Sequence, residues 1–211
     1  MRAPRLLTFD VFGTVLDWRQ GLSLALAAAG RPLSGSEFDR VVDRQGELEQ
    51  ELPFRTYREI TALSLVEVLG LDPAAADRVG ASVGTWPLYP DSAAALRRLL
   101  AATPCAAMTN SDRAHGEGVR ASLGFPLTAW ICAEDVRCYK PAPRFWREVG
   151  RRLGVPPGPD WWHVSAYADY DGEVAASLGL TTVFVDRPHT RPGPATHRVA
   201  DLAGLADLVG A

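Results

Sequence analysis

Residues 6–16 read Leu-Leu-Thr-Phe-Asp-Val-Phe-Gly-Thr-Val-Leu, an apolar run that is typical of a buried strand in a parallel sheet. Asp10 stands near the end of this run, and Gly13-Thr14 supplies a turn directly after it. In open α/β sheets ligands bind beyond the carboxyl ends of the strands, so we expect Asp10 to project into a site there. The stretch therefore predicts an α/β protein with Asp10 as a candidate nucleophile. The alternative interpretation is that these residues form a strand end and a tight turn without a catalytic role.

The composition is that of a globular protein. The 211 residues are 47% hydrophobic and 22% charged. The net charge of −3 does not indicate the positively charged surface that nucleic-acid binding requires. No apolar stretch approaches the roughly 20 residues of a membrane span. Cys105, Cys132 and Cys138 lack metal-ligand spacing, which predicts buried thiols in a reducing compartment. Because the first strand leaves no room for a signal peptide, we expect a cytoplasmic protein without nucleic-acid or membrane partners.

Residues 18–85 show only helical signals, and strands alternate with helices after them. Gly30 and Gly70 are typical helix ends, and Asp72-Pro73 is a typical helix start. The expected helices cover residues 20–29, 37–51, 57–69, 72–83, 91–100, 113–123, 144–153 and 172–178. The expected strands after the first cover residues 105–109, 129–132, 162–165 and 182–185.

This alternation predicts a Rossmann-like α/β core built on a parallel sheet. The helical segment interrupts the pattern. We therefore predict a core of residues 1–16 and 87–211 and an inserted helical cap domain of residues 17–86, hinged near Asp17 and Trp86. Residues 187–196 contain three prolines, which predicts a loop.

Asp10-Val11-Phe12-Gly13-Thr14 resembles the first motif of the haloacid dehalogenase superfamily, Asp-x-Asp/Tyr/Phe-Gly-Thr. Phosphatases of that superfamily carry a second Asp two residues after the first, which protonates an alkoxide leaving group. Phe12 stands at that position here. A halide leaves without a proton, so this replacement favours an enzyme that cleaves carbon–halogen bonds.

Thr109-Asn110 ends the second core strand and is expected at the same edge of the sheet as Asp10. A hydroxyl and an amide at that edge can hold a substrate carboxylate and solvate a departing anion. The pair resembles the second motif, a Ser or Thr that the dehalogenases follow with Asn. Ser111 or Asp112 is expected to cap the next helix.

Lys140-Pro141-Ala142-Pro143 resembles the Lys-Pro-x-Pro motif of the superfamily. A carboxylate nucleophile beside a carboxylate substrate needs a fixed cation, whose effect is larger in a dry site than in water. Lys140 is the single lysine of the chain, and all other Lys or Arg positions are arginine. This indicates that the position requires the compact ammonium group of lysine. A solvated loop lysine is the alternative.

The segment from His163 to Asp171 resembles the last motif, with a departure. Phosphatases carry a Mg²⁺-ligating Asp where this chain has Ala166, and a methyl group offers no hard oxygen ligand. Ser165 and Asp171 match the dehalogenase pattern, although their spacing is one residue longer. Asp171 is thus the candidate base, and Asp169 is an alternative that could share or replace its role.

Asp43-Arg44-Gln45-Gly46-Glu47-Leu48-Glu49 resembles the Trp-Arg-x-x-x-Leu-Glu stretch of the dehalogenase cap. The resemblance implies that Arg44 cradles the halide, and pairing of Arg44 with Glu47 or Glu49 is the alternative. Tyr170 matches an aromatic position of the halide pocket.

The four core motifs occur in order, and the closest likeness is to the L-2-haloacid dehalogenases. The resemblance implies hydrolytic conversion of a small 2-haloacid to the 2-hydroxy acid through an aspartyl ester, without a metal or other cofactor, in a possible homodimer. A Mg²⁺-dependent phosphohydrolase and a non-catalytic member remain the alternatives. The catalytic roles would fall to Asp10, Thr109, Asn110, Lys140, Ser165 and Asp171, and substrate or halide binding to Phe12, Thr14, Arg44 and Tyr170.

Overall fold

The strand that carries Asp10 lies inside a parallel sheet of six strands in the order β3-β2-β1-β4-β5-β6. The computed structural model describes residues 3–211. Every residue of β1 is buried, because β1 pairs with β2 on one side and β4 on the other. The strands are β1 (Leu6–Phe9), β2 (Cys105–Thr109), β3 (Ala129–Cys132), β4 (Trp161–Ser165), β5 (Thr181–Val185) and β6 (His197–Val199).

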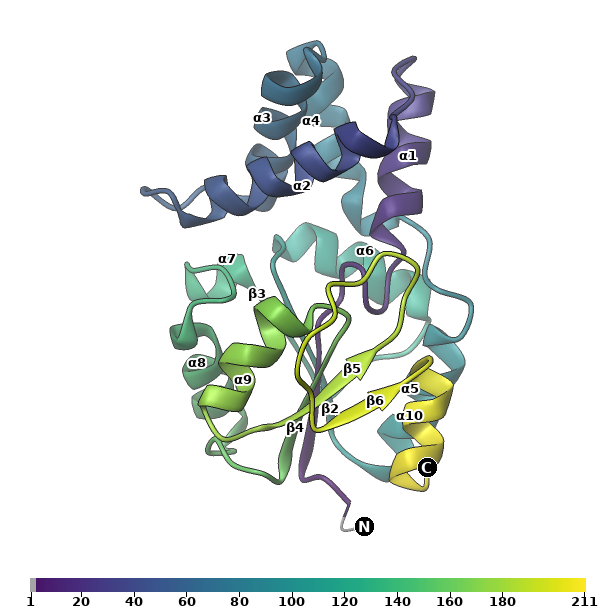
Figure 1. Ribbon diagram of the computed structural model, residues 1–211, viewed down its shortest axis with the longest axis vertical. Coiled ribbons are helices and arrows are strands. Elements are labelled where there is room, and N and C mark those ends of the chain that lie inside the picture. Colours follow the sequence, from purple (N-terminus) through teal and green to yellow (C-terminus); the bar gives the residue numbers. More distant parts are fainter. Residues whose placement is uncertain (1–2) are drawn as a thin grey trace.

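Helices cover both faces of this sheet (Figure 1). α5 and α10 lie on one face, and α8 and α9 lie on the other. The helices of this part are α5 (Ser92–Ala102), α6 (Arg113–Leu123), α7 (Ala133–Val136), α8 (Pro143–Leu153), α9 (Glu173–Ser177) and α10 (Leu202–Val209), with a π-helical turn η2 (Ala168–Gly172) before α9.

The register aligns the carboxyl ends of the central strands. Phe9 of β1 pairs with Ala107 of β2 and with Val164 of β4. The loops that follow these strands therefore open at one edge of the sheet, which is where the candidate site residues were expected.

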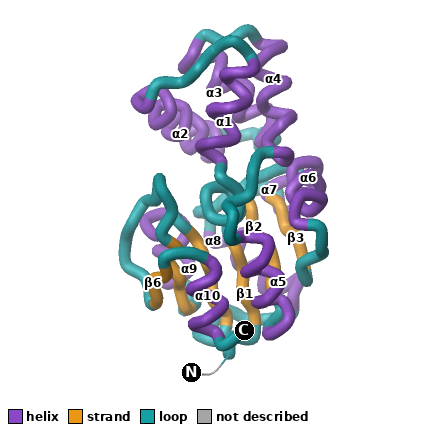
Figure 2. The backbone as a smooth tube through the Cα atoms, turned by 90° about the vertical axis from the view of Figure 1, so that its right-hand side faces the viewer, coloured by secondary structure: helices purple, strands orange, loops and turns teal. Residues whose placement is uncertain are grey.

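The helices between β1 and α5 form a separate layer above that edge (Figures 1 and 2). We call α1 (Trp18–Ala28), α2 (Gly35–Gln50), α3 (Tyr57–Leu69), α4 (Pro73–Ser82) and the 3₁₀ turn η1 (Val83–Thr85) the helix group. Ser34 and Thr56 each form a capping box, and Asp72 caps α4 with Pro73 at its first position. These side chains satisfy backbone N–H groups that the first helical turn leaves free.

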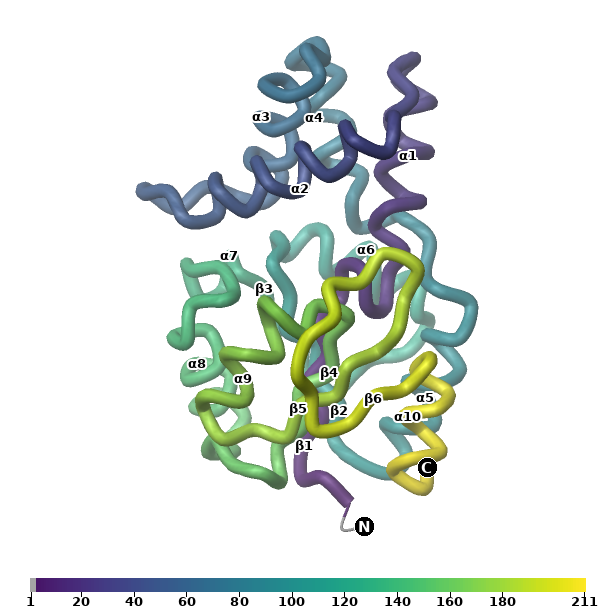
Figure 3. The backbone as a smooth tube through the Cα atoms, viewed as in Figure 1, coloured from purple at the N-terminus to yellow at the C-terminus, as the bar shows by residue number. Residues whose placement is uncertain are grey.

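The chain enters and leaves the helix group at one place. The Asp17 N–H donates to the Pro87 carbonyl at 2.8 Å, and Leu16 forms an antiparallel bridge with Leu88. In Figure 3 the outgoing and returning segments run side by side below α1. Asp17 lies at this place and Trp86 lies next to it, so the predicted hinge would fall here.

The predicted helices and strands are confirmed, with ends that differ by two residues or fewer at most positions. Residues 187–196 are a loop before β6, as predicted, whereas β6, α7 and α10 were not foreseen. Cys105 and Cys132 are buried, but Cys138 is partly exposed, which corrects the prediction of buried thiols for that residue. Within residues 3–211, no helix combines the length and apolarity needed to cross a membrane.

Candidate active site

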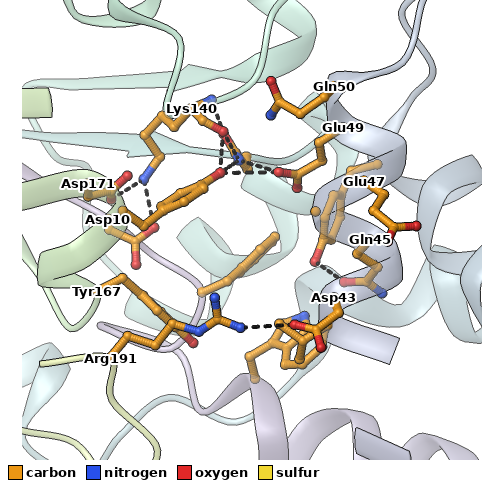
Figure 4. A pocket seen from close by; sticks show the side chains of 17 residues that line it. Asp10, Asp43, Gln45, Glu47, Glu49, Gln50, Lys140, Tyr167, Asp171 and Arg191 are labelled. Atoms are coloured by element: carbon orange, nitrogen blue, oxygen red, sulfur yellow. Dashed lines mark hydrogen bonds and ion pairs between the residues drawn. The ribbon is translucent and has the colours of Figure 1, made fainter. Parts of the chain in front are cut away.

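A cavity of about 500 Å³ lies between the carboxyl edge of the sheet and the helix group (Figure 4). The sheet and its loops contribute Asp10, Phe12, Asn110, Lys140, Tyr167, Tyr170, Asp171 and Arg191. The helix group contributes Trp18, Val42, Asp43, Gln45, Gly46, Glu47, Glu49, Gln50 and Tyr57. The predicted residues Asp10, Phe12, Asn110, Lys140, Tyr170 and Asp171 therefore meet in one pocket.

Asp10 follows β1 and is held through both carboxylate oxygens. The Thr14 hydroxyl donates to Oδ2 at 2.7 Å, and the Lys140 ammonium donates to Oδ1 at 2.9 Å. Burial raises the pKa of Asp10, and the charge of Lys140 opposes this effect. Asp10 is only 6% exposed, so its position and its orientation are fixed before a ligand arrives.

Lys140 joins the two candidate carboxylates. Its Nζ lies 2.9 Å from Asp10 Oδ1 and 2.6 Å from Asp171 Oδ2, and its side chain is 1% exposed. Burial alone would lower the pKa of Lys140, but the two carboxylates outweigh burial and raise it. The ammonium is thus a permanent positive charge between two acids, as the sequence predicted for the lysine of the Lys-Pro-x-Pro motif.

Asp171 has one occupied and one free oxygen. Oδ2 accepts from Lys140 and lies 3.3 Å from Nε2 of His163, whereas Oδ1 has no hydrogen-bond partner within residues 3–211. Burial opposes ionisation of Asp171, yet Lys140 and His163 lower its pKa overall. A buried carboxylate oxygen without a partner is available to accept from a water molecule. Asp169 is exposed and does not line the pocket, so the geometry favours Asp171 as the base.

His163 is a positioning residue to which the sequence analysis gave no role. Its Nδ1 lies 2.9 Å from the Thr8 hydroxyl, which also accepts from Trp161 Nε1 at 2.8 Å. A Thr8 hydroxyl donating to Nδ1 leaves the proton on Nε2, facing Asp171. The available signal was a histidine inside the otherwise apolar strand Trp-Trp-His-Val.

Asn110, Tyr170 and Glu49 form a polar cluster at one end of the pocket. Asn110 Oδ1 accepts from the Lys140 N–H at 2.8 Å, and its Nδ2 lies 3.0 Å from Glu49 Oε2 and 2.7 Å from the Tyr170 hydroxyl. The Tyr170 hydroxyl also contacts the Lys140 carbonyl and lies 3.2 Å from Glu49 Oε2. The sequence analysis considered Glu49 only as a partner of Arg44.

Arg44 does not reach the pocket, which corrects its prediction as a halide ligand. Its Nε lies 2.5 Å from Glu67 Oε2 of α3, and its Nη1 lies 2.8 Å from Glu47 Oε2. On α2, Gln45 and Glu49 share the face that lines the pocket, one turn apart, and Arg44 lies on the flank beside α3. The pairing with Glu47, which the sequence left open, is present, whereas Arg44 makes no ion pair with Glu49 within the described chain.

Three further predicted residues lie outside the pocket lining. Thr14 is fully buried behind Asp10, where it holds the carboxylate and accepts from the Ala166 N–H, so it cannot bind substrate. Ser165 accepts from the Tyr167 N–H at 3.1 Å and shapes the turn after β4. Thr109 is buried, and its hydroxyl has no partner in the described chain.

Arg191 lines the pocket although nothing in the sequence distinguished it. It belongs to the loop between β5 and β6, which rises toward the helix group in Figure 3. Its Nη2 lies 3.3 Å from Asp43 Oδ1 of α2. Arg191, and not Arg44, is thus the arginine that lines this pocket.

The residues of the pocket do not fit a Mg²⁺ site. Among residues 3–211 there is no group of three or more His, Cys, Asp or Glu side chains arranged to hold a metal ion. Ala166 offers only a methyl group, and the Lys140 ammonium lies between the two carboxylates that would otherwise face a cation.

Comparisons with known proteins agree with this architecture. A family model of haloacid dehalogenase-like hydrolases matches residues 4–159. The chain is 27% identical to (S)-2-haloacid dehalogenase 4A of Burkholderia cepacia, over 97% of this chain and 94% of that protein. It is 28% identical to the solved structure of L-2-haloacid dehalogenase PA0810, over 98% of this chain and 99% of that chain, with a TM-score of 0.84.

A structure of an L-2-haloacid dehalogenase from Xanthobacter autotrophicus, with chloropropionic acid covalently bound, also shares the fold. It is 20% identical over 98% of each chain, with a TM-score of 0.82.

Proposed function

The chain belongs to the haloacid dehalogenase-like hydrolases, and from this premise we propose that it hydrolyses a small 2-haloacid to the 2-hydroxy acid. One observation carries the proposal. Asp10, Lys140 and Asp171 are joined in the pocket, while Phe12 and Ala166 replace the carboxylates that phosphoryl transfer by this family would need. The name of the Burkholderia cepacia relative supports the same substrate class.

In the first step Asp10 attacks the carbon that bears the halogen. A carboxylate oxygen forms the new bond from the side opposite the halogen, and the carbon–halogen bond breaks with its electron pair going to the halide. Thr14 and Lys140 fix the carboxylate, so the attack starts from an aligned geometry. The product of this step is an ester between Asp10 and the substrate carbon, inverted in configuration.

Two ends of the pocket would receive the charged parts of the substrate. Asn110 and Tyr170, which contact each other, would receive the departing halide, and the ring of Phe12 lines the same pocket. Arg191 would supply the charge that binds the substrate carboxylate, exchanging its partner Asp43 for the ligand. This assignment gives Arg191, rather than Arg44, a role in recognising the anion.

In the second step water hydrolyses the ester. Oδ1 of Asp171 accepts a proton from the water, whose oxygen attacks the ester carbonyl carbon. The intermediate then expels the alkoxide of the product, which takes the proton back from Asp171. The 2-hydroxy acid leaves, and Asp10 returns to its ionised form by releasing a proton.

We also propose that residues 17–86 act as a cap domain on a core of residues 1–16 and 87–211. α2 lines the pocket opposite the edge of the sheet, so closure of the helix group would exclude water during the first step. The pair formed by Asp43 and Arg191 spans the two parts.

The test of this function is halide release from S-2-chloropropionate and chloroacetate, with and without EDTA. We expect the full rate in EDTA, because the residues present do not fit a Mg²⁺ site. A strict requirement for Mg²⁺, or turnover of phosphate esters alone, would contradict the proposal. No turnover of either substrate class would favour a non-catalytic member.

A further inference from the structure

Glu49 is an acidic side chain at the end of the pocket that would receive the halide. Its Oε2 lies 3.0 Å from Asn110 Nδ2 and 3.2 Å from the Tyr170 hydroxyl. In Figure 4 it extends from α2 toward the side of the pocket that carries Lys140. The reaction proposed above assigns it no role.

An ionised Glu49 conflicts with its place in the pocket. A halide leaving toward Asn110 and Tyr170 develops a full negative charge beside this carboxyl group. Two like charges at close range in a water-poor pocket repel each other strongly. A neutral Glu49 removes the repulsion and adds an O–H donor where the charge develops.

The hydrogen bonds of the cluster leave a contact that a proton on Glu49 could supply. Asn110 Nδ2 and the Tyr170 hydroxyl make five contacts among themselves, Glu49 and the Lys140 carbonyl. The amide supplies two hydrogens and the hydroxyl one. The Tyr170 hydroxyl lies within reach of two acceptors, the Lys140 carbonyl and Glu49 Oε2, and has one hydrogen for them. A protonated Glu49 supplies a fourth hydrogen, which is directed to Tyr170 in the empty pocket and turns to the halide when the halide departs.

We propose that Glu49 works as a neutral carboxylic acid that donates a hydrogen bond to the halide as the carbon–halogen bond breaks. The electron pair of that bond goes to the halide, and the proton stays on Glu49 after the halide leaves. Fluoride has the highest charge density of the halides and gains most from such a donor. This inference rests on the proposed function.

The electrostatic surroundings of Glu49 agree with this role. Burial raises the pKa of Glu49 to about 8, although Tyr170, Lys140 and Asn110 oppose the shift. Glu49 is neutral below that value and ionised above it. Activity that needs the neutral form should therefore fall as the pH rises through about 8.

The other titratable groups that face Glu49 do not explain such a loss. Burial raises the pKa values of Tyr57, Tyr139 and Tyr170 above the ordinary tyrosine range. The pKa of Lys140 is raised and that of Asp171 is lowered, so both stay charged across this pH range. Asp10 gains activity as it ionises, which is the opposite trend. The pocket also contains the charged residues Asp43, Glu47 and Arg191.

The experiment compares Glu49→Gln, which keeps an N–H donor and cannot ionise, with Glu49→Leu, which has no donor. In the wild type we expect kcat/KM to fall by about tenfold per pH unit above the pKa. Glu49→Gln should keep its activity at high pH. Glu49→Leu should lose about tenfold or more with 2-bromo substrates and more with 2-fluoro substrates. Asp39→Asn, on the same helix and outside the pocket lining, is the matched control and should behave as the wild type.

Bromide binding separates this inference from the proposed function, since it needs no turnover. Calorimetric titration with sodium bromide should give weaker binding at pH 9.5 than at pH 6.5 in the wild type and equal binding in Glu49→Gln. The same pH dependence in both proteins would overturn the role of Glu49. Glu49-dependent bromide binding without halide release from any 2-haloacid would overturn the proposed function and leave the anion site in place.

Discussion

Asp10 and Asp171 contact the same ammonium group, yet their environments push their pKa values in opposite directions. Burial raises the pKa of Asp10, whereas Lys140 and His163 together outweigh burial and lower that of Asp171. Both oxygens of Asp10 have partners, and Asp171 keeps Oδ1 free within the described chain. In the proposed reaction these environments suit the two residues to different steps, Asp10 as a positioned nucleophile and Asp171 as a base for water.

Separate substitution of the two carboxylates should stop the reaction at different points. Asp10→Asn should abolish alkylation, because an amide is a poor nucleophile. Asp171→Asn should leave alkylation partly intact and slow ester hydrolysis by about 100-fold or more, because the base is lost. Mass spectrometry after mixing with substrate should find an adduct on the Asp10 peptide of the Asp171 variant. Normal turnover by that variant, with ester accumulating in Asp169→Asn instead, would make Asp169 the base.

At the scale of single residues, the sequence predicted side chains that directly follow strands or occupy a motif. Asp10 and Asn110 directly follow β1 and β2, and Asp171 lies in the turn η2 after β4. The carboxyl ends of these neighbouring parallel strands meet at one edge of the sheet, which brings the three residues together. Glu49 and Arg191 come from a helix and a loop whose approach to the pocket depends on packing between distant segments. That packing leaves no local pattern in the sequence.

At the scale of elements, α2 shows why Arg44 was misplaced. Neighbouring residues of a helix point about 100° apart, so a short motif match cannot tell which face turns to the pocket. Arg44 lies on the flank next to α3, while Gln45 lies on the face that lines the pocket. The helix itself was predictable from its capping signal and its apolar positions. Its rotation about its own axis was set by contacts with α3.

The turn after β1 depends on Gly13 for two independent reasons. Its φ is +89°, and a Cβ at this position would lie 2.4 Å from the Tyr167 hydroxyl. Gly13→Ala should therefore lower the free energy of unfolding by about 2 kcal/mol or more and displace Tyr167 from the pocket. Urea unfolding measures the first effect and halide release the second.

Gly46→Ala is the matched control for this glycine prediction. Gly46 lies inside α2, and a Cβ added there would have no atom of the described chain within 4 Å, apart from its own helix backbone and chain neighbours. The substitution should raise the free energy of unfolding by about 0.5–1 kcal/mol, the ordinary gain in a helix interior. Equal destabilisation by both substitutions would mean that the turn after β1 does not need glycine.

At the scale of the whole molecule, the order of strands and helices could be predicted because parallel strands need a connecting segment, usually a helix, between them. Helical signals over residues 18–85, between the first strand and the later alternation of strands and helices, predicted an insertion into the α/β pattern. The late elements β6 and α10 escaped prediction because they are short and follow a proline-rich loop. The same loop carries Arg191 into the pocket lining. A segment without a clear helix or strand pattern in the sequence therefore contributes one of the two positively charged side chains of the pocket lining.

The charge balance of the pocket makes Arg191 the test of how the whole molecule recognises an anion. The lining contains the acidic residues Asp10, Asp43, Glu47, Glu49 and Asp171 against the cations Lys140 and Arg191. Lys140 is already shared by two carboxylates, whereas Arg191 forms a half-exposed and easily exchanged pair with Asp43. Arg191 is therefore the pocket cation that a substrate carboxylate can engage at the lower cost.

Arg191→Gln should raise KM for a 2-haloacid by about tenfold while changing kcat less, because the charge contributes mainly to binding. The matched variant Asp43→Asn frees Arg191 from its partner and should lower KM. Steady-state kinetics at two ionic strengths measures both, and the KM of the wild type should rise with salt more than that of Arg191→Gln. If both substitutions raise KM equally, the pair only holds α2 against the loop before β6, and the carboxylate binds elsewhere.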